Sequence, residues 1–95
     1  MTEQEQKIEQ VKNQVCTYYR VTFEQIIDKN QSKQVSSARN MLMYILHCDL
    51  GVSFGVLSKM LNRTSRNVQM RVADTKYIVE NQKKYQKQYT EIKAI

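Results

Sequence analysis

The chain has 95 residues, no proline, two glycines and a formal net charge of +6. A chain of this length forms one small domain that buries only about 60 to 65% of its unfolded surface, so there is little room for an active-site cavity. The longest apolar run, residues 41–46, is far shorter than the roughly 20 residues that span a bilayer. We therefore expect a cytoplasmic protein without membrane contact, and the scarcity of helix-breaking residues favours helices over hairpins.

Two amphipathic segments open the chain. The first, residues 3–19, carries apolar side chains at three- and four-residue steps on one face, which predicts a helix. Thr22 and Gln25 have the spacing of a capping box, so a second, short helix starts there and ends near Asp28. The apolar face of the first helix consists of Ile8, Val11, Val15, Tyr18 and Tyr19.

The most apolar segment, residues 33–49, follows a polar turn at residues 29–33. Its stripe contains Ala38, Leu42 and Ile45, and neighbouring apolar residues widen the stripe almost to the full circumference. A helix that is apolar on nearly all sides is buried, so we predict that this one is the centre of the domain. Gly51 is placed where a left-handed C-terminal cap would end it.

Residues 53–72 predict two helices joined by a very short turn. Ser53 can cap the first helix, whose apolar positions are spaced by three or four residues. After the polar turn at 62–65, Thr64 or Ser65 can cap the second helix, which keeps Val68 and Val72 on one face. Two helices with a turn this short form a helix-turn-helix, a motif that places its second helix in the DNA major groove.

Positive charge gathers in the same half of the chain. Residues 1–31 hold four basic and five acidic side chains, whereas residues 32–95 hold eleven basic and four acidic ones. A basic half of this kind indicates a polyanionic partner, either nucleic acid or an anionic membrane surface. The alternative is a surface whose lysines only keep the protein dispersed.

The last segment, residues 81–95, is mostly polar and is expected to be a C-terminal helix or tail outside a domain formed by residues 1–80. Tyr85, Tyr89 and Ile92 keep a helical spacing within it. We expect residues 82–95 to be dispensable for the fold. The competing interpretation is an interaction module in which this stripe faces a partner, or a DNA-binding domain that forms a homodimer through the segment.

No catalytic or metal-binding pattern is present in the sequence. His47 is the only histidine, and nothing around it suggests a catalytic triad. Cys16 and Cys48 have neither the spacing of a zinc site nor a disulfide framework, so we expect buried free thiols in a reducing compartment. We expect no enzyme activity, no cofactor, no metal and no small-molecule ligand.

Three stretches resemble the C-terminal DNA-binding domain of the bacterial replication initiator DnaA, a helical domain in the structural neighbourhood of the Trp repressor. Residues 15–21, VCTYYRV, are similar to the family's V-A-x-Y-Y-x-V. Residues 38–44, ARNMLMY, resemble its A-R-Q-x-A-M-Y, and Lys33 lies where the family has a basic loop. The third stretch follows S-L-P-x-I-G-x-x-F-G-G-R-D-H-T-T-V at Ser53, Leu57, Leu61, Arg63 and Val68.

This chain departs from the family pattern in the turn and at the start of the second helix. Asn62 stands where the family has Gly-Gly, and residues 64–67, TSRN, replace its D-H-T-T. The resemblance, which covers roughly residues 11–80, therefore implies the family's scaffold but not its preferred DNA sequence. The implied fold is all-α, with five to six helices and a helix-turn-helix.

The resemblance implies binding to double-stranded DNA, in replication or transcription control of a bacterial, phage or mobile-element system. Arg66 and Asn67 suit guanine and adenine edges, and Met70 suits a thymine methyl group. Lys33 and Arg39 match family positions at the backbone and minor groove, while Lys59 and Arg63 are placed for phosphates. The predicted DNA-binding residues are Lys33, Arg39, Lys59, Arg63, Thr64, Ser65, Arg66, Asn67, Met70 and Arg71.

Overall fold

The computed structural model describes residues 2–29 and 32–95, and within these ranges it contains helices and no strand. The prediction of an all-α fold with five to six helices is confirmed. The predicted turn at residues 29–33 lies partly outside the described residues. In chain order the helices are α1 (Glu3–Tyr19), α2 (Phe23–Ile27), α3 (Lys33–Cys48), α4 (Phe54–Leu61), α5 (Ser65–Asn81) and α6 (Lys83–Lys93).

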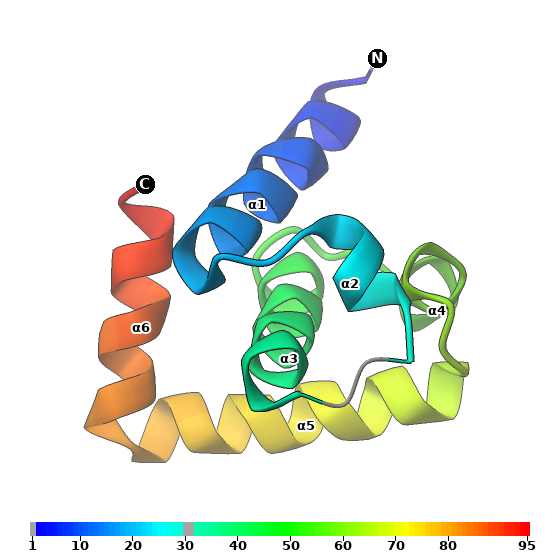
Figure 1. The fold of residues 1–95 in the computed structure, drawn as a ribbon. Coiled ribbons are helices and arrows are strands. Elements are labelled where there is room, and N and C mark those ends of the chain that lie inside the picture. Colours follow the sequence, from blue (N-terminus) through cyan, green and yellow to red (C-terminus); the bar gives the residue numbers. More distant parts are fainter. Residues whose placement is uncertain (1, 30–31) are drawn as a thin grey trace.

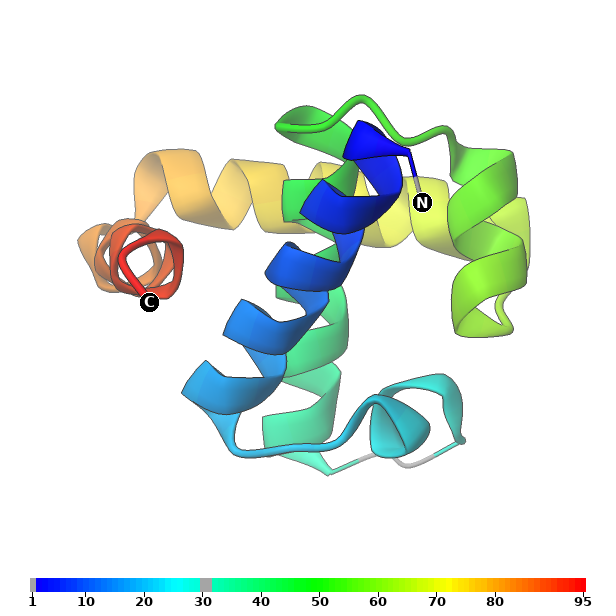
Figure 2. The same cartoon turned by 90° about the horizontal axis from the view of Figure 1, so that it is seen from above.

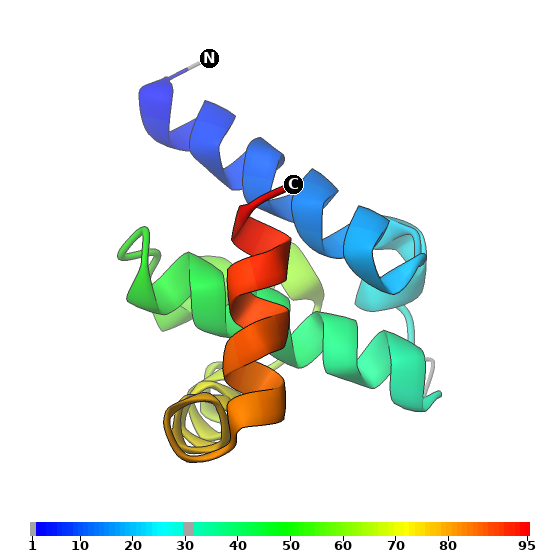
Figure 3. The same cartoon turned by 90° about the vertical axis from the view of Figure 1, so that its left-hand side faces the viewer.

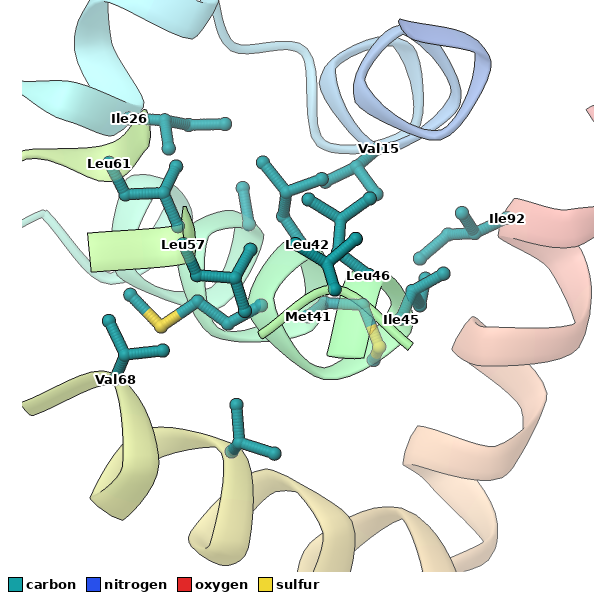
Figure 4. Packing of buried hydrophobic residues seen from close by; sticks show 14 of the residues in the cluster. Val15, Ile26, Met41, Leu42, Ile45, Leu46, Leu57, Leu61, Val68 and Ile92 are labelled. Carbon is teal, nitrogen blue, oxygen red and sulfur yellow. The ribbon is translucent and has the colours of Figure 1, made fainter. Parts of the chain in front are cut away.

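Helix α3 is the centre of the domain, as its nearly continuous apolar surface predicts. Helices α1 and α5 pack on different sides of it, and α2 and α4 lie on the side of the domain that Figure 1 shows on the right. Seen from above, α1 crosses over α3 while α5 runs behind both (Figure 2). Ala38, Leu42 and Leu46 have no exposed surface, and they meet Val15 and Leu57 in the core shown in Figure 4.

Side-chain caps explain where the helices begin. The Thr22 hydroxyl accepts a hydrogen bond from the Gln25 amide, and the Gln25 side chain accepts one from the Thr22 amide, which confirms the predicted capping box. Ser53 caps α4 in the same way, and Thr64, not Ser65, caps α5. Gly51 follows α3 with a φ of +72°, the left-handed conformation that was predicted for it.

Helix α6 is part of the packed domain. It leaves the end of α5 and runs up to α1, passing in front of α3 in the view of Figure 3. Ile92 has no exposed surface and joins the same core as α3, with Tyr85 and Tyr89 packed against it. This packing gives the apolar stripe a partner inside the chain, and it leads us to predict, against the expectation from the sequence, that residues 82–95 are needed for a stable fold.

Polar contacts hold α6 on both of its neighbours. The Tyr89 hydroxyl donates to the Asp49 carboxylate at 2.6 and 2.8 Å, and Lys93 Nζ lies 2.7 Å from the same carboxylate. On the other side, the Tyr18 hydroxyl of α1 donates to Glu91 at 2.7 Å. The C-terminal helix is thus tied to the end of α3 and to α1 by groups far apart in the sequence.

The expectation for the cysteines can be compared with the fold. Both cysteines are free, but Cys16 is only half-buried and Cys48 is exposed, so the expectation of buried thiols is wrong for Cys48. None of the described helices combines the length and apolar character that crossing a membrane requires. The described residues also contain no group of three or more potential metal ligands.

Candidate nucleic-acid interface

Helices α4 and α5 form the predicted helix-turn-helix. Asn62 ends α4 in the left-handed conformation, with φ 55° and ψ 49°, and its amide donates to Ser58 O. Asparagine tolerates this conformation better than most residues, so the family's glycines are not needed for the turn. Leu57 and Leu61 are fully buried and lie on the same side as Val68 of α5 in Figure 4.

One face of α5 is buried and the opposite face is exposed. Val68 and Val72 are buried with Thr75 and Val79, as the periodicity predicts. The side chains of the opposite face are exposed, and Met70 and Tyr77 retain 55% and 67% of their surface. An exposed methionine and tyrosine on a helix that also carries Arg66 are available to contact a partner surface. The exposed members of this face are Arg66, Met70, Ala73 and Tyr77.

Arg39 and Arg63 differ from the other predicted site residues because they point inward, toward the end of α2. Arg39 is only 7% exposed, and its Nε–H donates to Ile26 O at 2.7 Å while Nη2 donates to Asp28 O at 3.1 Å. Arg63 donates from Nη2 to Asp28 O at 2.6 Å and from Nη1 to Ile27 O at 3.3 Å. Both guanidinium groups therefore satisfy the last carbonyls of α2, which have no partner within the helix.

We expect Arg39→Met to destabilise the fold by about 1 to 3 kcal/mol, because it leaves the carbonyl group of the buried Ile26 without its side-chain donor. Urea unfolding followed by circular dichroism measures this change. Arg66→Met is the matched control, since Arg66 is exposed, and it should stay within about 0.5 kcal/mol of the parent. Equal stability of the two variants would show that Arg39 does not hold α2.

A small polar pocket lies between α3 and α5, with a volume of about 130 Å³. Burial, reinforced by the positive charges of Arg63 and Arg71, lowers the pKa of Arg39 from its ordinary value. Two lining residues, Ser36 and Asn40, are not among the predicted site residues, although their four-residue spacing beside Arg39 places them on one face of a helix. The pocket is lined by Ser36, Arg39, Asn40, Arg63, Asn67 and Arg71.

The remaining predicted residues lie around the helix-turn-helix. Lys33 is exposed at the first position of α3, and Lys59 is exposed on α4. The Thr64 hydroxyl accepts from the Asn67 amide at 3.1 Å, so its side chain is occupied as a helix cap. Ser65 and Arg71 are also exposed. The structure thus gathers Arg39, Arg63, Asn67 and Arg71 at one pocket and leaves Lys33 and Lys59 outside it.

His47 has a structural role that explains its position. Its Nδ1 lies 2.8 Å from Val52 O, and its ring stacks on Phe54 with 4.1 Å between the ring centroids. These contacts join the end of α3 to the start of α4 across the loop that contains Gly51. The histidine therefore helps to orient the helix-turn-helix on the central helix.

The chain matches a known protein family. The model of the bacterial dnaA protein helix-turn-helix matches residues 8–72, more than half of the chain. The matched region begins in α1 and ends in α5, and it includes α4 and every residue that lines the pocket between α3 and α5. A comparison with curated proteins gives no match.

Proposed function

We propose that this chain, which belongs to the bacterial DnaA helix-turn-helix family, binds double-stranded DNA sequence-specifically with α5 in the major groove. Membership of the family implies DNA binding. The proposal adds the DNA-reading residues, and it places this binding in the replication or transcription control of a bacterial, phage or mobile-element system. Its main support is the exposed face of α5, where Arg66 and Met70 stand beside the turn of the motif.

The charge distribution supports the same face. Residues 50–73, from the loop before α4 through the first half of α5, carry four basic side chains and no carboxylate. The four are Lys59, Arg63, Arg66 and Arg71. Uncompensated positive charge on a helix-turn-helix attracts the phosphate backbone, and side chains on the exposed face of α5 can then reach the base edges.

Exposure and hydrogen bonding separate the residues that we propose as mobile DNA contacts from those that are held in place. Lys59 and Lys33 are exposed and have the flexible, charged side chains that suit backbone phosphates. Arg66 is exposed and can form the bidentate contact with guanine that specifies a base pair. Arg39 and Arg63 donate hydrogen bonds to carbonyl groups at the end of α2. We therefore expect them to contribute positive charge at a fixed position, and not to move toward the DNA.

We expect Arg66→Ala to weaken binding to the preferred duplex by about 1 to 3 kcal/mol and to relax selectivity at one base pair. Lys59→Ala should weaken binding to all duplexes alike and reduce the slope of log affinity against log salt by about one unit. With about five phosphate contacts, the parent slope should be about −4 to −5. Selection of duplexes from a random pool measures the selectivity. Fluorescence anisotropy at several salt concentrations then measures the affinities and the salt slopes.

Lys87→Ala is the control for loss of one positive charge. Lys87 is 80% exposed and belongs to α6, at the opposite end of the molecule from α4 (Figure 1), so this variant should bind DNA as the parent does. If the parent binds no duplex at low salt, or if all three variants bind every duplex like the parent, DNA recognition by this face is refuted.

A further inference from the structure

The polar pocket between α3 and α5 has the composition of an anion-binding site. Three of its lining residues are arginines and none is an acid. Arg39, Arg63 and Arg71 come from α3, the turn before α5 and the second turn of α5. The fold thus brings together three positive charges that are well separated in the sequence, without a carboxylate among the lining residues to neutralise them.

Two of the three arginines are fixed in place and the third is not. Arg39 and Arg63 donate to the carbonyl groups at the end of α2. Arg71 is exposed, and within residues 2–29 and 32–95 its guanidinium group has no hydrogen bond or ion pair. Arg39 and Arg63 therefore form a rigid basic wall, and Arg71 retains donors that can close on a ligand.

The polar neighbours of the arginines suit a tetrahedral oxyanion. Asn40 and Asn67 carry amide groups that can donate hydrogen bonds, and Ser36 carries a hydroxyl group that can do the same. The volume of about 130 Å³ is several times the roughly 10 to 15 Å³ of cavity space that holds one water molecule. A phosphate group fits this space, and the planar fork of an arginine matches two of its oxygens.

We propose that this pocket binds one phosphate group, held by Arg71 against the fixed wall of Arg39 and Arg63. The identification of that group as a backbone phosphate of duplex DNA rests on the proposed function. Asn67 then belongs to the phosphate site and not to base reading, while its exposed neighbour Arg66 is not among the residues that line the pocket. Binding one phosphate here sets the register of α5 along the major groove.

The first experiment measures binding of inorganic phosphate. Nuclear magnetic resonance titration of the parent, with sodium chloride at matched ionic strength as the blank, should give saturable shifts of the arginine Nε–H signals. Arg71→Gln should weaken phosphate binding by about tenfold or more, because it removes a charge-assisted, bidentate donor. Lys76→Gln, which removes one exposed charge from the same helix outside the pocket lining, should bind phosphate like the parent. Absence of saturable binding, or equal binding by all three proteins, overturns the proposal.

The second experiment identifies the source of the phosphate. The probes are duplexes in which a single phosphate is replaced by a neutral methylphosphonate. At one position this replacement should weaken binding of the parent and leave the affinity of Arg71→Gln unchanged. Lys76→Gln should lose affinity at that position as the parent does. If the parent binds phosphate in an Arg71-dependent way but binds no duplex, the proposed function fails and the pocket is a site for a free phosphate compound. If the duplex is bound without dependence on Arg71, the proposed function stands and the pocket proposal fails.

Discussion

Removal of residues 83–95 is expected to destabilise the protein by at least about 4 kcal/mol, because the deletion uncovers the side of the core that Ile92 closes. The deletion also removes the hydrogen bonds that Tyr89 and Glu91 make with Asp49 and Tyr18. A domain of this size has only about 5 to 14 kcal/mol of total stability. At about 4 to 8 °C for each kcal/mol, the thermal midpoint should fall by at least about 16 °C. Differential scanning calorimetry of the truncated and full chains measures the fall.

Two isoleucines of the same segment provide a matched pair for this test. Ile92 has no exposed surface, whereas Ile95 is 53% exposed. Ile92→Ala should cost about 2 to 5 kcal/mol, and Ile95→Ala should stay within about 0.5 kcal/mol of the parent. An unchanged thermal midpoint in both the truncated chain and Ile92→Ala would restore the interpretation of this segment as a dispensable tail.

Leu42→Ala is expected to destabilise the fold by about 2 to 5 kcal/mol, the range for removal of a buried leucine side chain. The loss is largest where the surroundings cannot relax into the cavity. Leu42 has no exposed surface and belongs to the helix against which α1, α2 and α5 all pack. Little relaxation is possible at the junction of so many elements, so the upper part of the range is expected. Chemical denaturation with urea measures the loss, and the slope of stability against urea should stay the same.

Leu42→Met is the control for the Leu42→Ala experiment. Methionine fills a similar volume with a flexible side chain, so this variant should lose less than about 1.5 kcal/mol. A Leu42→Ala variant as stable as Leu42→Met would contradict the placement of α3 at the centre of the core.

Arg63 links the packing of the domain to the proposed interface. Its backbone lies in the turn of the helix-turn-helix, and its side chain donates to carbonyl groups of residues 27 and 28. The turn is therefore attached to α2, and α2 is attached to α3 through Arg39. The two arginines also line the polar pocket between α3 and α5. The same two side chains therefore position α5 and carry charges that are proposed to receive the DNA backbone.

The sequence by itself determined the features that depend on neighbours within a few residues. The cap of α4 at Ser53 follows from a side chain that accepts a hydrogen bond from the next turn, and the same chemistry limits the cap of α5 to Thr64 or Ser65. The left-handed conformation of Gly51 follows from its lack of a Cβ atom. The three- and four-residue periodicity separated Val68 and Val72 from the exposed face of α5, since a helix repeats about every 3.6 residues. The family motifs are local patterns of the same kind, which is why the helix-turn-helix could be predicted.

Only the tertiary structure decided what covers each face. Periodicity shows that Tyr85, Tyr89 and Ile92 share one side of a helix, but the same stripe can pack on its own domain or on a partner. The surface that receives it comes from α1, α5 and Tyr44 of α3. The arginines present the same problem. An arginine beside a helix start can reach DNA or a nearby carbonyl group, and the carbonyls that receive Arg39 are 11 and 13 residues away in the chain. The polar pocket exists because α3 and α5 pack together at a particular place, and a local sequence pattern does not determine where two helices meet.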